Sequence, residues 1–264
     1  MRTHRPSYTL FAAVLLWTVS ALAAPPLSST WMGKALDDQL QLNFRSGEQG
    51  NMGLSIPRSA FQGLNMAEGT DTSFQLVREA GTVKFEGRFS GTEGAGHYRF
   101  EPNATYLGEM AKLGYTEISP EEQLQLALFD VGPARVKALA ELGYTKLPHD
   151  ALLQVAIFQV TPEHIRALAE LDLRNLELDE LVATRIHGVT PAFIREVKGL
   201  GFANPTLEEF LSMRIHGVTP SYVREIREAG YPNATIQQLV ELRIHAIDAD
   251  YVRSLAGDKK TGKK

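Results

Sequence analysis

A unit of 29 residues repeats five times, without a gap, in the second half of this chain. The copies are 114–142, 143–171, 172–200, 201–229 and 230–258. The run Arg-Ile-His-Gly-Val-Thr-Pro sets their register: it begins at Arg185, returns at Arg214, and starts again as Arg-Ile-His at Arg243. A fixed short period is typical of stacked arrays, in which each unit contacts its neighbours and the surface more often binds partners than catalyses reactions. The repeat therefore predicts an array.

Each copy carries the signals for two short helices. Capping boxes, in which a hydroxyl residue is followed three residues later by Glu or Gln, begin the first helix at Ser119, Thr206 and Thr235. A glycine in the repeated run ends this helix, and Thr-Pro then begins the second helix. The first helix should bury one apolar face at helical spacing, which in the third copy comprises Leu178, Leu181, Val182 and Ile186.

Residues 24–113 have a different pattern. Apolar and polar residues alternate in several short segments separated by turn residues, which is a strand signal. These segments are Gln39–Phe44, Ser73–Val77, Val83–Phe89 and His97–Phe100. We predict a small antiparallel sheet of four to six strands with one apolar face, then a short helix from Tyr106 to Leu113. Because no Pro- or Gly-rich linker follows, we expect the sheet to pack on the first repeat. The fold class is thus α+β: a small β domain followed by an α-helical array.

The first 23 residues read as a signal peptide. A basic start precedes an apolar run from Leu10 to Val19, and Ala21-Leu22-Ala23 is the small-x-small pattern of a cleavage site. The alternative is an uncleaved membrane anchor, although the run is short for a span of about 20 residues. The chain has no cysteine, which excludes disulfides, thiolate metal sites and a thiol nucleophile. We therefore expect a bacterial periplasmic or secreted protein, with a basic disordered tail at 259–264.

Three histidines recur at one position of the first helix: His187, His216 and His245. They could form a metal-binding or pH-sensing ladder. Equivalent atoms of stacked helices lie about 8–10 Å apart, however, whereas zinc needs its nitrogen ligands at about 2 Å. We favour a structural role at the helix C-terminus, where a histidine can bond the last carbonyls and meet the negative end of the dipole. We expect no metal and no cofactor.

Arginines also recur, and they are our candidates for contacts with a partner. Those of the second helix are Arg166, Arg195, Arg224 and Arg253, and those of the first helix are Arg185, Arg214 and Arg243. They could form a basic stripe for an anionic partner. The interpretation that we favour is a solvated face on which they pair with acids such as Glu196, Glu225 and Glu228.

Two further functions stay open as alternatives. The segment from Asp130 to Val136 resembles the hairpin of helix-hairpin-helix DNA-binding modules, in which glycine amides hold a phosphate. Residues 114–258 hold 13 Lys and Arg against 21 Asp and Glu, a net charge of −8, which disfavours phosphate binding. The other alternative is an enzyme with an unrecognised site between the two regions. The absence of the familiar hydrolase, metallopeptidase and phosphate-loop motifs disfavours it.

The segment from Phe74 to Gly87, followed by the Leu-Gly-Tyr and Arg-Ile-His-Gly-Val-Thr-Pro repeats, resembles a group of uncharacterised exported bacterial proteins. Similar repeats are appended to BlaR-type membrane metallopeptidase sensors, whose peptidase part is missing here. The resemblance implies a sensing or partner-binding role in the envelope. We predict a non-enzymatic binding or scaffolding module for another protein or peptide, with no nucleic acid as partner and with membrane contact only if the signal segment is uncleaved. Because the repeated run serves mainly to stop and start helices, we expect contacts at exposed positions that vary between copies.

Overall fold

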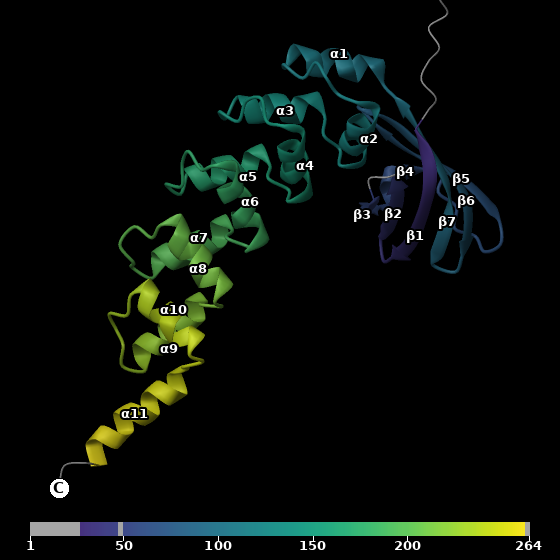
Figure 1. Cartoon of the computed structure of the whole chain (residues 1–264). Coiled ribbons are helices and arrows are strands. Elements are labelled where there is room, and N and C mark those ends of the chain that lie inside the picture. The colour runs from purple at the N-terminus through teal and green to yellow at the C-terminus, as the bar shows by residue number, and fades with distance from the viewer. Residues whose placement is uncertain (1–26, 47–49, 262–264) are drawn as a thin grey trace, which may run out of the picture.

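The computed structural model describes residues 27–46 and 50–261. The predicted signal segment therefore lies outside the described residues. The chain forms an antiparallel β-sheet followed by an α-helical array, as the sequence predicts, and the array leads away from the sheet as a long curved stack (Figure 1). No helix among the described residues is both long and apolar enough to cross a bilayer.

The sheet has seven strands in the order β3-β2-β1-β7-β6-β5-β4, and neighbouring strands are antiparallel. The strands are β1 (Ser28–Leu36), β2 (Gln39–Ser46), β3 (Gly50–Pro57), β4 (Phe61–Gln62), β5 (Asp71–Arg78), β6 (Gly81–Ser90) and β7 (Glu93–Pro102), with a 3-10 turn η2 (Arg58–Ala60) before β4. The four predicted strands are confirmed, but the predicted number of four to six was wrong. The alternation in β1 and β3 is weak because several of their residues are glycine, alanine or serine.

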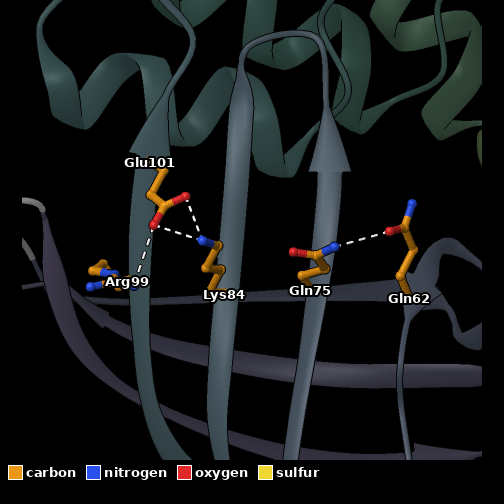
Figure 2. Close-up of polar contacts among 5 residues, drawn as sticks. All are labelled: Gln62, Gln75, Lys84, Arg99 and Glu101. Atoms are coloured by element: carbon orange, nitrogen blue, oxygen red, sulfur yellow. Dashed lines mark hydrogen bonds and ion pairs between the residues drawn. The ribbon is translucent and has the colours of Figure 1, made fainter.

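One face of the sheet is apolar and the other is polar, as predicted. Trp31, Phe74 and Phe85 are buried on the inner face, where the two phenylalanine rings stack with centroids 4.7 Å apart. On the outer face, cross-strand polar pairs connect β4 to β5 and β6 to β7 (Figure 2). Gln75 donates to Gln62 over 3.0 Å, and the ammonium group of Lys84 lies 2.7 Å from the carboxylate of Glu101 (Figure 2). The hydrogen bond from Lys84 is the main reason why the pKa of Glu101 is lowered.

Eleven helices make up the array of the described residues. Each repeat contributes two helices. The first helices are α2 (Pro120–Leu128), α4 (His149–Ile157), α6 (Leu178–Ile186), α8 (Leu207–Ile215) and α10 (Ile236–Ile244). The second helices are α3 (Pro133–Ala140), α5 (Pro162–Ala169), α7 (Pro191–Gly199), α9 (Pro220–Glu228) and α11 (Ala249–Thr261). The helix α1 (Ala104–Lys112) precedes them. The last helix takes in the first residues of the predicted basic tail, and residues 262–264 lie outside the described part.

The predicted helix boundaries have the expected caps. The capping boxes at Ser119, Thr206 and Thr235 are all formed. Thr190 accepts a hydrogen bond from the amide of Phe193, so it caps α7 ahead of the proline. A left-handed residue follows the C-cap of every first helix, and the five members of this set are Asp130, Gln159, Gly188, Gly217 and Ala246.

Helix α1 has the contacts of a second helix. The hydroxyl of Tyr106 in α1 donates to the carbonyl of Val131 over 2.9 Å, and that of Tyr222 in α9 donates to Ile247 over 2.7 Å. Both bonds join residues 25 positions apart, at equivalent places of the 29-residue register. The stacking therefore begins at α1, directly after the last strand.

The sheet packs on the first repeat without a break in the core. One cluster of buried apolar residues runs from the inner face of the sheet through α1 and α2 into α4, and a second cluster fills the rest of the array. At the junction, the side chain of Gln123 is 2% exposed and donates to the carbonyls of Ala80 and Asn103. The expected packing of the sheet on the first repeat is thus confirmed, and it fixes the sheet to one end of the array (Figure 1).

Candidate functional site: an isoleucine ladder on the array

A row of exposed isoleucines follows the first helices of the array. Each lies at the last position of its helix, at one place in the 29-residue register. We call this row the isoleucine ladder: Ile157, Ile186, Ile215 and Ile244, with exposed fractions of 48%, 55%, 54% and 56%. The prediction that Ile186 belongs to a buried face was therefore wrong. A single exposed isoleucine needs no explanation, but four at one position of a stacked repeat form a row, and rows of exposed apolar residues are candidates for interaction sites.

The same position is covered in the first repeat. Its residue there is Leu128, which is 3% exposed and belongs to the core cluster shared with the sheet. The helix α2 packs against β6 and β7, whereas the later first helices lead away from the sheet (Figure 1). This position of the repeat is therefore buried where the array joins the sheet and exposed further along the array.

The arginines of the first helices clamp one repeat to the next. The Nε atom of Arg185 donates to the carbonyl of Phe158 over 3.0 Å, and that of Arg214 donates to the carbonyl of His187 over the same distance. The guanidinium groups of Arg214 and Arg243 also lie over the aromatic rings of Phe193 and Tyr222 in the preceding repeat.

These clamping arginines keep their charge at the surface. All three side chains are exposed, and none makes an ion pair within the described part of the chain. Since Arg185, Arg214 and Arg243 each precede an isoleucine of the ladder, they form a basic edge along it. We call these three residues the arginine edge.

The arginines of the second helices are exposed but divide into two kinds. Arg166 pairs with Glu163 at 3.6 Å, and Arg253 pairs with Asp250. Arg195 and Arg224 make no ion pair with any described residue, so the predicted pairing with Glu196, Glu225 and Glu228 is not formed. They stay candidates for polar contact with a partner.

The three recurring histidines are the C-cap residues of α6, α8 and α10. Their backbone amides bond the last turn of each helix, as at His187, whose amide donates to Ala183 over 3.0 Å. The imidazoles of His187, His216 and His245 are exposed and bond no other described side chain or carbonyl. Across residues 27–46 and 50–261, no group of three His, Asp or Glu side chains is placed to hold a metal ion.

One histidine that sequence reasoning passed over is buried. His164 in α5 is 8% exposed, and its Nε2 lies 2.8 Å from the hydroxyl of Thr184, which donates onward to Leu181. Burial, and then the charge of Arg185, lower the pKa of this imidazole. Its position is filled by Phe193 and Tyr222 in the next two repeats, so comparison of the copies could have indicated that it is buried.

The hairpin that resembles a DNA-binding module is covered by the sheet. Asp130 pairs with Arg78 of β5 at 3.3 Å, and a Cβ atom placed on Gly132 would lie 2.9 Å from a carboxylate oxygen of Glu79. A carboxylate there would repel a phosphate. This geometry gives the nucleic-acid alternative no support.

The junction between the sheet and the array also offers little for catalysis. Its buried polar residue is Gln123, which does not ionise. Tyr106 is buried beside it, and burial, followed by the charge of Glu79, raises the pKa of its hydroxyl. That hydroxyl donates a hydrogen bond to the carbonyl of Val131 over 2.9 Å.

The chain matches no protein-family model and no curated protein. The role of the site therefore has to be inferred from its own residues.

Proposed function

We propose that this chain is an exported, non-enzymatic module that binds or scaffolds another protein through its helical array. The observation that carries the proposal is the isoleucine ladder: Ile186 and its equivalents are about half exposed, while Leu128 at the same position of the first repeat is buried in the core cluster shared with the sheet. Full burial of an exposed isoleucine contributes about 1.5–3 kcal/mol, so covering one that is half exposed should contribute about 1 kcal/mol. Four in a row supply the apolar centre that a stable protein interface needs.

Placement in the bacterial envelope rests on the signal-like first 23 residues and on the absence of cysteine. The resemblance of the repeats to those attached to BlaR-type sensors supports a role in sensing. Ile186 belongs to the ladder on the first helices, whereas Arg195 and Arg224 lie on the second helices. All three are exposed, so a partner could contact the array through either set of helices.

The test is retention of a partner from an envelope extract of the source cells on the immobilised array-bearing protein. The variant I186Q/I215Q should lose the retained protein. The variant R195E/R224E tests whether the partner also contacts the arginines of the second helices. The variant M32Q/L36Q, which changes exposed apolar residues of β1, serves as the control. The proposal fails if nothing is retained, or if retention is the same for wild type and both array variants.

A further inference from the structure

The ladder and the arginine edge together define the chemistry of what they can bind. We propose that the occupant is an amphipathic α-helix of another protein, lying along the array with its apolar stripe on the isoleucine ladder and its carboxylates facing the arginine edge. This inference rests on the proposed function, because it names the partner of the same surface. The partner helix belongs to another molecule, unlike the sheet of this chain on which α2 packs.

The spacing of the ladder favours a helix over an extended peptide. Neighbouring packed helices generally lie about 8–10 Å apart, which gives the order of the step from one first helix to the next. A helix rises about 10.5 Å in seven residues and returns the same face, so a heptad comes close to each step. A strand places same-face residues about 6.6 or 13 Å apart, and both distances lie further from the middle of the range than the heptad does.

The charges beside the ladder give the partner a sign. Arg185, Arg214 and Arg243 are exposed and make no ion pair with described residues, although the array as a whole is acidic. Their Nε hydrogen bonds to the preceding repeat, seen at Arg185 and Arg214, hold the guanidinium groups in place. A preorganised row of cations loses little side-chain entropy on meeting carboxylates, which favours an acidic flank on the partner helix.

The ladder is also continuous with an interface that the chain already makes. Leu124 and Leu128 of α2 are buried in the core cluster shared with the sheet, and their equivalents in α6 are Val182 and Ile186. The array therefore carries the same apolar pair from a covered first repeat into repeats that the sheet does not reach. The partner helix would cover the isoleucine ladder on the repeats that lie beyond the sheet.

The probe is a synthetic helical peptide of about 24 residues, enough to span three steps of the ladder. It carries leucine at the two apolar positions of each heptad and glutamate on one flank; a second peptide carries lysine in place of glutamate. Binding to the full chain is measured by fluorescence anisotropy. The glutamate peptide should bind at least tenfold more tightly than the lysine peptide, and I186Q/I215Q/I244Q should weaken it roughly a hundredfold.

The variants are chosen so that loss of folding is not mistaken for loss of the site. The three isoleucines are exposed and glutamine is a good helix former, so thermal melting followed by circular dichroism should match the wild type. The variant M32Q/L36Q should bind the glutamate peptide as the wild type does. Equal binding of the two peptides, or an unchanged affinity of the isoleucine variant, would overturn the inference.

A second copy of this chain is the alternative occupant of the ladder, and sedimentation of the chain alone tests it. A wild-type dimer that I186Q/I215Q/I244Q converts to monomer would assign the ladder to a second copy and overturn the helix. If the peptides fail while the envelope extract still yields a protein whose retention depends on the ladder, the partner has another shape and the proposed function stands. If both experiments fail, both proposals fall.

Discussion

At the scale of single residues, one position of the repeat keeps the same left-handed backbone conformation although its side chain differs between copies. The residue after the C-cap of each first helix is left-handed, with φ of 56° at Asp130, 57° at Gln159, 68° at Gly188, 70° at Gly217 and 54° at Ala246. A side chain in this region costs about 1–2 kcal/mol, whereas glycine adopts it freely. Stacking of the repeats therefore imposes the conformation, and glycine merely makes it easier.

This difference predicts opposite effects of one chemical change. Gly188→Ala should lower the free energy of unfolding by about 1 kcal/mol, because the new Cβ meets a left-handed backbone. Gly108→Ala, in the exposed middle of α1 with open space around its Cβ position, should raise it by about 0.5–1 kcal/mol. Urea denaturation of the two variants beside the wild type measures both effects. Changes of the same sign would contradict the argument.

His164 predicts a pH dependence of stability. Its pKa in the folded chain is lowered from the ordinary value of 6.5, so in the window below pH 6.5 the unfolded state binds more protons. Its contribution should be complete above about pH 6.5 and should be lost as the pH falls toward the folded pKa. The double variant H164F/T184M reproduces the Phe193 and Met213 pair of the next repeat and should remove this loss.

Urea midpoints at pH 7.5 and pH 5.0 measure the effect of His164. The control H187Q changes an exposed histidine and should keep the wild-type difference between the two pH values. A double variant that weakens with acid as much as the wild type would assign the loss to other groups.

At the scale of elements, local signals predict the helices well because each repeat contains its own caps. Thr206 accepts from the amide of Glu209 over 3.2 Å, and the carboxylate of Glu209 accepts from the amide of Thr206 over 2.9 Å. Thr206→Ala should therefore lower the free energy of unfolding by about 1 kcal/mol, while Thr206→Ser should stay near the wild type. Denaturation followed by circular dichroism measures the change, and equal losses in both variants would show that packing of the methyl group matters more than the cap.

The exposure of the ladder could not be predicted in the same way. Helical periodicity places Ile186 on the same face as Val182, and one helix alone does not reveal which part of that face a neighbour covers. Val182 is 8% exposed because adjacent repeats reach it, whereas Ile186 at the end of the helix is not reached. The sequence singles out the clamping arginines but not their bonds to the preceding repeat, since a bond from Arg214 to a carbonyl 27 residues earlier depends on how repeats stack.

At the scale of the whole molecule, the sheet and the array are joined by a departure from the repeat. The position of Gln123 is filled by leucine or phenylalanine in the other four copies, for example Leu152 and Phe210, all of them buried. In the first copy, the amide instead donates to the carbonyls of Ala80 and Asn103 over 2.7 and 3.1 Å. Glutamine is thus the residue that lets a repeat end against strands rather than against another repeat.

Gln123→Leu should restore the pattern of the repeat and yet weaken the junction. The carbonyls of Ala80 and Asn103 would each lose one donor, at a cost of about 1 kcal/mol, because Ala80 keeps its bond from the amide of Asn103. Because each repeat contacts mainly its neighbours, the loss should stay local. Native-state hydrogen exchange should therefore quicken in α1, α2 and the turn around Ala80, while α8 to α10 keep their protection. Uniform quickening along the array would mean that sheet and array unfold as one unit, and unchanged exchange at the junction would mean that apolar contacts alone hold the sheet in place.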